Sequence, residues 1–191
     1  MSVENTMNLP VVATRGLVLF PNQEILIEVG RPKSMNAIEE AEKYFNGHVL
    51  LVSQKDVLTD DPKEEELYTV GTLAHIKNVK HKQGFLRVTF SGLQRASIAS
   101  INEDSQMLFG TINLLEDELG NPDEEAALIR AINREIKNAV AFERTQNLGG
   151  SINIPKEFWD NFLFQSMPAT QLADQFAQRF PLSLVQEPRL L

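Results

Sequence analysis

The stretch LPVVATRGLVLFPNQEILIEVGRPKS, residues 9–34, contains two apolar runs, a turn between them and the first residues of an expected helix. In the second run, QEILIEV, every other residue is apolar: Ile25, Ile27 and Val29. This alternation is the period of a strand that buries one face, so we expect a strand here and another in the first run, LPVVAT. Leu26 adds an apolar residue to the outer face, which predicts partial cover on that side.

A helix and a buried strand are expected directly after this stretch. Pro32 suits a first helical turn, and Gly47 can end the helix. Between Pro32 and Gly47, four positions share one helical face: Met35, Ile38, Glu42 and Phe45. Three of these four residues are apolar, and Ala41 lies beside them. Residues 48–54, HVLLVSQ, are then almost continuously apolar, which is typical of a strand buried on both faces.

Short strands separated by glycine turns continue along the chain. Residues 70–90, VGTLAHIKNVKHKQGFLRVTF, predict two strands with Gly84 in the turn between them. Ser91 and Gly92 predict the next turn, with a further strand beyond it, and MLFGTINLL (107–115) predicts the last strand. This pattern is typical of a small barrel or sandwich, here with one embedded helix.

Helical spacing replaces the strand period after the last strand. Pro122 fits a first helical position, and apolar residues then recur at helical spacing: Leu128, Ile132, Ile136 and Val140. Residues 154–164 and 168–180 predict two further helices. We therefore expect a β-rich subdomain, 1–117, followed by a helical subdomain, 118–191.

The composition excludes several classes of site. The chain has 191 residues, a formal net charge of −8 and no cysteine. Disulfides and thiolate metal sites are therefore excluded, and the acidic charge disfavours nonspecific binding to nucleic acid or anionic membranes. The polar start is unlike a secretory signal, and no apolar run approaches the roughly 20 residues that span a bilayer. We expect an intracellular, cytoplasmic protein.

Catalytic and cofactor-binding motifs are missing from the sequence. None of the ten glycines belongs to a G-x-x-x-x-G-K-[ST] or G-x-G-x-x-G pattern, and no serine has the G-x-S-x-G setting. The three histidines form no H-E-x-x-H pair, and the acidic segment TDDPKEEE, residues 59–66, has no regular ligand spacing. We expect no catalytic, cofactor or metal site in these residues, and a solvated loop at the acidic segment.

Apolar residues are the better candidates for binding. We expect contacts with a polypeptide from the loop after the first strand, from the hairpin around Gly84 and from the helix predicted at 154–164. The residues are Leu17, Phe20, Pro21, Val79, Phe85 and Trp159. For the loop residues, a plug at the end of a barrel is favoured over such a contact, and for the helix, packing inside its subdomain is favoured. The hairpin also carries Lys77, Lys80 and Lys82, but a solvated tip is favoured over a phosphate-binding one in an acidic chain.

Four stretches together resemble the amino-terminal domain of the ATP-dependent Lon protease: LPVVATRGLVLFPNQEILIEVGRPKS, VGTLAHI, FSGLQRASI and QLADQFAQRFPL. Their order and spacing extend the resemblance from Leu9 to Leu184. The first strand departs from the leucine-rich PLLPLR pattern of the family, since it is LPVVATR here. The resemblance implies an α+β fold, in which a β-rich, PUA-like pseudo-barrel subdomain with one embedded helix precedes an α-helical bundle.

The resemblance also implies a larger protein around this chain. In the family, this domain leads through a long helix into an ATPase module and a Ser-Lys peptidase module. The resemblance therefore implies that the parent enzyme binds ATP and Mg and that this fragment binds no cofactor. The last residues, SLVQEPRLL, resemble the start of that helix, so we expect a fragment. The implied function is a non-catalytic module of a hexameric protease of protein quality control, which recognises unfolded or damaged polypeptides and supports assembly.

Two other functions stay open. PUA-like folds include RNA binders, and an RNA-binding module would show salt-dependent affinity centred on the hairpin lysines. A purely structural domain would order the hexamer and contact substrate only incidentally. Deleting the domain from the full enzyme separates recognition from scaffolding: loss of hexamers indicates scaffolding, whereas intact hexamers with ATPase activity but no degradation indicate recognition.

Overall fold

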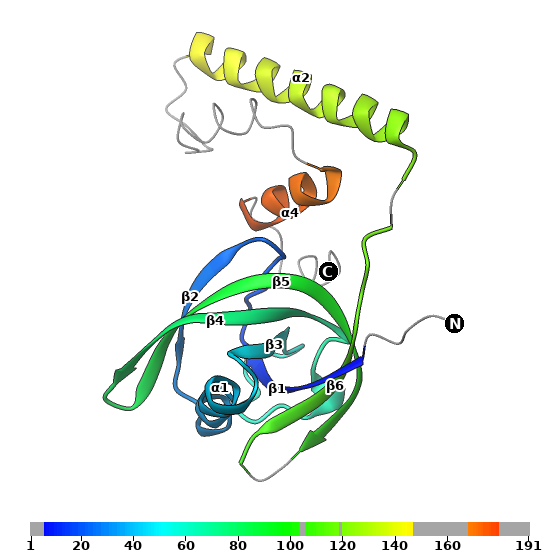
Figure 1. Cartoon of the computed structure of the whole chain (residues 1–191). Coiled ribbons are helices and arrows are strands. Elements are labelled where there is room, and N and C mark those ends of the chain that lie inside the picture. The colour runs from blue at the N-terminus through cyan, green and yellow to red at the C-terminus, as the bar shows by residue number, and fades with distance from the viewer. Residues whose placement is uncertain (1–5, 104–105, 119, 147–167, 180–191) are drawn as a thin grey trace. The chain divides into compact units, whose positions relative to one another are not determined.

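The computed structural model describes residues 6–103, 106–118, 120–146 and 168–179 (Figure 1). The chain forms two compact units. The first consists of residues 1–116 together with 174–191, and the second consists of residues 117–173.

Strands dominate the first part of the chain and helices the last, as the sequence predicts. The elements of the first part are β1 (Thr6–Thr14), β2 (Glu24–Val29), α1 (Pro32–Tyr44), β3 (His48–Ser53), the short 3-10 helix η1 (Glu64–Glu66), β4 (Val70–Lys82), β5 (Phe85–Glu103) and β6 (Leu108–Leu114). The described helices that follow are α2 (Pro122–Gln146) and α4 (Ala169–Arg179).

The six strands form one sheet whose pairings close on themselves. The strand order is β2-β5-β4-β3-β1-β6, and β6 also pairs with β5, so β5, β4, β3, β1 and β6 make a ring (Figure 1). β1 and β3 are parallel, and the other pairs are antiparallel. The long strand β5 pairs with β2 through its first half and with β6 through its second half. β2 pairs with no described strand other than β5.

β3 supplies both faces of the core, as its apolar run predicts. Val49 and Leu51 belong to the apolar cluster on one face, and Leu50 and Val52 belong to the cluster on the other. Successive side chains of a strand point to opposite faces, so a strand that is covered on both sides is apolar throughout.

β2 buries one face only. Ile25 and Ile27 pack against the first of these clusters and Val29 belongs to it, as the alternation predicts. The expected cover over Leu26 is wrong, because this side chain is 59% exposed. Leu26 lies on the outer face of a strand at the end of the sheet order, and one face of an antiparallel strand pair can lie in water.

The turn predicted at Ser91 and Gly92 is also wrong, since β5 continues through both residues. Gly92 instead allows the backbone of β5 to lie close to the backbone at Phe20. A Cβ added to Gly92 would lie 2.3 Å from the Phe20 carbonyl oxygen, and the Gly92 N–H donates to the Gln23 carbonyl oxygen at 2.8 Å. The Asn22 N–H in turn donates to the Gly92 carbonyl oxygen at 2.9 Å. By contrast, the predicted turn at Gly84 is confirmed, with a positive φ of 86°.

α1 packs against β1, β3 and β6 at one end of the ring (Figure 1). Its buried residues are mostly small: Ser34, Ala37, Ile38 and Ala41. The predicted face is therefore right for Ile38 and Ala41 but wrong for Glu42, which is exposed because the buried stripe lies further round the helix. The helix ends before Gly47, whose φ is 73° and whose N–H donates to the Ala41 carbonyl oxygen at 2.9 Å.

The helices of the last part follow the sequence prediction where the structure describes them. α2 forms as expected, although Leu128 and Ile132 of its apolar stripe are 63% and 38% exposed. The helix predicted at 154–164 lies outside the described residues. α4 confirms the third predicted helix, and its Leu172 is buried. Within the described ranges, no helix is long and apolar enough to cross a membrane.

Candidate functional site

A cleft of about 470 Å³ opens in the first unit, where the ends of β1 and β2 meet the start of α1. Val12 and Leu17 line it from β1 and the loop that follows, and Ile27 and Val29 line it from β2. Ligand sites in proteins commonly measure about 300–1,000 Å³ and are lined mainly by apolar side chains. The cleft is therefore large enough for a short segment of polypeptide or a small molecule.

The cleft lies where two strand edges have no partner. β1 pairs with β6 only from Thr6 to Val11, whereas its pairing with β3 continues to Thr14. From Val12 onward, the edge of β1 away from β3 has no strand partner in the described ranges, and β2 has β5 on one side only. Unpaired strand edges present N–H and C=O groups that can bond an added strand.

The loop that carries Leu17 is held in place through its backbone. The Leu17 carbonyl oxygen accepts hydrogen bonds from Thr14 Oγ1 and Ser53 Oγ, both at 2.7 Å. Two residues further on, the Leu19 carbonyl oxygen accepts a buried bond from Thr72 Oγ1 at 2.5 Å. This side of the cleft is therefore fixed by the sheet and does not depend on a ligand for its shape.

Charged and polar residues form the rim of the cleft. The Arg31 guanidinium donates to Gln54 Oε1 at 2.6 Å, and Gln54 Nε2 donates to the Thr59 carbonyl oxygen at 2.9 Å. Arg15 forms an ion pair with Asp60 at 2.5 Å. Burial lowers the pKa of Arg31 from its usual value and the positive charge of Arg15 lowers it further, while the negative charges of Asp60 and Asp61 raise it in part. The rim thus has a partly buried positive centre at Arg31.

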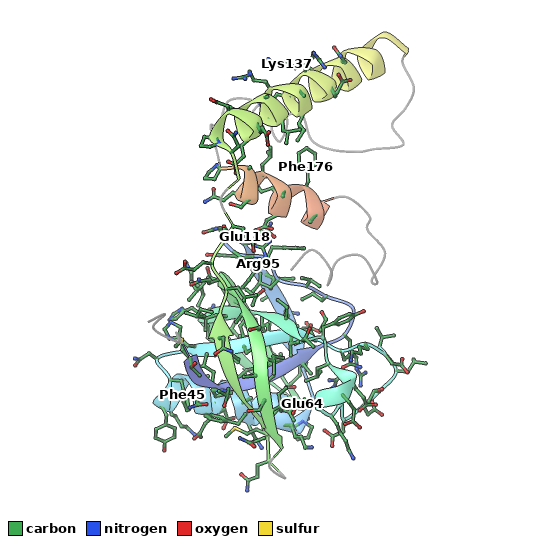
Figure 2. All side chains as sticks on the ribbon, turned by 90° about the vertical axis from the view of Figure 1, so that its right-hand side faces the viewer. Phe45, Glu64, Arg95, Glu118, Lys137 and Phe176 are labelled. Atoms are coloured by element: carbon green, nitrogen blue, oxygen red, sulfur yellow. The ribbon has the colours of Figure 1, made fainter. Side chains whose placement is uncertain are left out.

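The acidic segment 59–66 is mostly exposed, as predicted. Its aspartates pair with Arg15 and Lys33, and Glu64, labelled in Figure 2, accepts a hydrogen bond from the Ile101 N–H at 3.0 Å. In the part of the chain that the structure describes, no group of three His, Cys, Asp or Glu side chains is placed to hold a metal ion. The segment instead closes one side of the cleft through Asp60.

Of the three loop residues predicted to contact a polypeptide, the structure places one in the cleft. Leu17 lines it, half-buried. Pro21 is buried, and Phe20 is 1% exposed and packs with Val18 and Ala177. Phe20 and Pro21 are therefore buried, which agrees with the packed role that the sequence favours for them. Contact of these two side chains with a polypeptide stays a prediction.

The two predicted hairpin residues are not among those that line the cleft. Val79 and Phe85 are half-buried, and Val79 packs against the first core cluster. Phe85 lies next to Gly30, which lines the cleft, since a Cβ added to Gly30 would lie 3.9 Å from the Phe85 Cβ. The structure therefore places Leu17 in the cleft and Phe85 beside one of the lining residues, while Trp159 lies outside the described residues.

Acidic residues of β2 offset part of the positive charge of the hairpin. Lys77 pairs with Glu24 at 2.9 Å, and Arg87 forms an ion pair with Glu28. Lys80 is exposed on the same strand as Lys77. The basic surface at this hairpin is therefore narrow.

Several cleft residues were missed as site residues by sequence reasoning. Val12, Ile27 and Val29 were assigned to strands and their core, and Arg31 and Ser34 to the start of a helix. Their local assignments are right, but only the tertiary structure shows that they meet. The local signal available was the sequence Gly-Arg-Pro after β2, which predicts a helix start and hence a group of unpaired backbone N–H groups.

The chain is similar to known proteins over nearly its whole length. Residues 8–191 match the family described as the ATP-dependent protease La (LON) substrate-binding domain. Lon protease of Halothermothrix orenii is 32% identical over 190 residues, which cover 98% of this chain and 23% of that protein. Lon protease of Lachnoclostridium phytofermentans is 40% identical over 132 residues, which cover 68% of this chain and 16% of that protein. The chain thus spans less than a quarter of the length of these relatives.

Two solved structures share the fold. The N-terminal domain of Mycobacterium avium complex Lon protease superposes with a TM-score of 0.70 at 17% identity, covering 96% of this chain and 88% of that one. A Lon N-terminal domain protein from Xanthomonas campestris gives a TM-score of 0.59 at 14% identity, covering 94% and 86%. At these identities the likeness shows the fold alone, and the sequence matches show the family. This chain belongs to the family of Lon protease substrate-binding domains.

Proposed function

We propose that this chain is the non-catalytic substrate-recognition and assembly module of an ATP-dependent Ser-Lys protease of protein quality control. The longer protein would carry the ATPase and peptidase modules, use ATP and Mg, act in the cytoplasm and assemble as a hexamer. The fold would divide into a PUA-like pseudo-barrel subdomain, 1–117, and a helical bundle, 118–191. Membership of the family supports this proposal, and the missing phosphate-loop and nucleophile motifs agree with it.

The observation that carries the proposal is the apolar cleft between two unpaired strand edges. Unfolded polypeptides expose apolar side chains together with unpaired backbone groups, and folded proteins hide most of both. An extended segment in the cleft can place an apolar side chain against Val12 and Ile27 while its backbone bonds the edge of β2. A site that needs both features selects unfolded chains without a requirement for one particular sequence.

Weak binding at one such site suits a domain that passes its substrate to a motor. Repetition of the domain around a ring raises the overall affinity through effective concentration, without any new contact. We keep Leu17 and Phe85 as the first side chains to test, because Leu17 lines the cleft and Phe85 lies beside the lining residue Gly30. Contacts by Val79 and Trp159 are tested next, and contacts by Phe20 and Pro21 require the loop to leave the core.

A titration of the isotope-labelled chain with a reduced, alkylated protein tests this function. We expect changes in the amide shifts around Val12, Leu17 and Ile27, and smaller changes elsewhere. A response confined to the acidic segment 60–66 would contradict recognition through the apolar cleft. Titration with single-stranded RNA is the matched comparison, since an RNA-binding module would respond at Lys80 and Lys82 in a salt-dependent way.

A further inference from the structure

The start of α1 offers hydrogen-bond donors to the cleft. The first N–H groups of an α-helix have no acceptor within the helix, and they carry a partial positive charge. In the 13-residue helix α1, no side chain caps this end, Pro32 has no N–H, and the Ser34 N–H makes no hydrogen bond with the described residues. Gly30, Arg31 and Ser34 all line the cleft, so this helix end faces it.

The Ser34 side chain is a second, independent sign of a ligand at this place. The residue is 6% exposed and lines the cleft, and its hydroxyl makes no hydrogen bond with the described residues. The hydroxyl oxygen is not fully enclosed by protein, so it can bond water or a ligand in the cleft. An anionic acceptor in the cleft would accept from the Ser34 hydroxyl and from its N–H together.

Arg31 provides a positive charge next to these donors. Arg15 and Lys33 pair directly with Asp60 and Asp61, whereas Arg31 forms no ion pair with a described carboxylate and feels these two aspartates only at longer range. Its guanidinium donates to Gln54 Oε1 and approaches two carbonyl oxygens at 3.5 Å, which leaves part of its five N–H donors for a ligand. An anion bound here would also offset the burial that lowers the pKa of Arg31.

We propose that Ser34 and Arg31 bind the free C-terminal carboxylate of a polypeptide whose last residue is apolar. This inference rests on the function proposed above and names the part of the substrate that the cleft would hold. The last side chain would lie against Val12, Leu17 and Val29, and the residues before it would extend along the edge of β2.

The neighbouring apolar surface favours a chain end over other anions. An α-carboxylate is attached to a Cα that bears its own side chain, so a chain end with an apolar last residue presents an anion next to an apolar group. The cleft is lined by a donor for the anion, Ser34, and by an apolar residue for the side chain, Val29. The carboxylate of an internal Asp or Glu ends a polar side chain, and the peptide chain continues on both sides of it. Inorganic phosphate would use the donors but leave the apolar surface in water.

Fluorescence anisotropy with short labelled peptides tests the proposal on the 191-residue chain. The probes are GSGSGSLV with a free carboxylate, the same peptide with a C-terminal amide, and GSGSGSLK with a free carboxylate. We expect the free acid GSGSGSLV to bind at least about tenfold more tightly than its amide, because hydrogen bonds to a charged group are the strong ones. The lysine-ended peptide should bind more weakly than the valine-ended one.

Three variants assign the difference to residues. Ser34→Ala and Arg31→Gln should each reduce the preference for the free acid over the amide. Lys80→Gln removes an exposed positive charge outside the cleft and should keep the full preference. Arg31 also holds Gln54, so circular dichroism checks its variant, and Ser34→Ala, which removes a single oxygen atom, decides the matter if the Arg31 variant is unfolded.

Each outcome has a defined meaning. Equal affinity for the acid and the amide, with shifts at the cleft, overturns the carboxylate subsite but leaves polypeptide recognition in place. Competition by millimolar phosphate or acetate as strong as that by the peptide shows a general anion site and also overturns the proposal. Failure of the peptides and of an unfolded protein to bind anywhere overturns the proposed function as well.

Discussion

Replacing Gly92 by alanine should destabilise the protein because two backbones meet at this residue. A Cβ at position 92 would lie 2.3 Å from the Phe20 carbonyl oxygen and 3.2 Å from the Leu19 Cγ. The first of these atoms belongs to the backbone, so no side-chain rotation can relieve the contact. The loop from Leu19 to Gln23 must move away from β5, and the same loop carries Leu17 into the cleft.

The expected cost can be estimated from the contacts that change. Overpacking a well-packed site commonly costs about 1–3 kcal/mol. Moving the loop also weakens the bonds of Gly92 with Gln23 and Asn22, each of which contributes about 1 kcal/mol. Alanine stabilises the protein by about 0.5–1 kcal/mol through the entropy of the unfolded chain. The balance is a loss of roughly 3 kcal/mol, a large part of the about 5–15 kcal/mol typical of a domain.

Urea unfolding followed by circular dichroism measures this loss, with Gly30→Ala as the matched control. Gly30 is exposed, has no positive φ, and would place its Cβ 3.9 Å from its nearest neighbours, which is ordinary contact. We expect Gly30→Ala to change the free energy of unfolding by less than about 1 kcal/mol. Equal stability of the two variants would refute the argument that the glycine at position 92 is required by the approach of the Phe20 backbone.

Three further predictions concern single positions. Ile27→Ala should weaken binding of an unfolded protein about fivefold by removing apolar surface from the cleft, whereas Leu26→Ala, on the opposite face of β2, should leave the affinity unchanged in the same titration. Thr72→Val should lower the free energy of unfolding in urea by about 1–3 kcal/mol, because the buried Leu19 carbonyl oxygen loses its donor; unchanged stability would show that this bond contributes nothing. Gly84→Ala should lower the free energy of unfolding by about 1–2 kcal/mol, because φ is 86° at this position. No atom lies within 4 Å of the added Cβ, so a larger loss would contradict backbone strain as the only cause.

Local pattern was sufficient for most elements of the fold. The alternation in β2, the unbroken apolar run in β3 and the proline at the start of α1 each reflect contacts that a strand or helix makes with its immediate surroundings. The errors arise where a distant residue decides. Gly92 is a glycine because of Phe20, which is 72 positions away, and the sequence around Gly92 has the same composition as a turn.

The candidate site could be predicted only in part for the same reason. Leu17 was selected as an apolar residue in a loop, and the structure places it in the cleft. Phe20 was selected on the same ground, but its side chain lies in the interior. Apolar character alone cannot separate these two, because a core residue and an exposed binding residue can be chemically alike. Ser34 and Arg31 are more specific candidates, because the Ser34 hydroxyl bonds none of the described residues and Arg31, which lines the same cleft, forms no ion pair with them.

The position of the cleft follows from the order of the strands. β1 and β3 are parallel neighbours, and parallel neighbours need a long crossover connection. This crossover contains β2 and α1, and β2 pairs with β5 rather than with β1. No described strand therefore pairs with the far edge of β1 beyond Val11 or with the second edge of β2, and α1 must begin beside them, since only Gly30 and Arg31 connect β2 to Pro32. One connection thus brings unpaired strand edges, an apolar surface and the donors of a helix start to the same opening, and an extended chain with a negatively charged end complements all three.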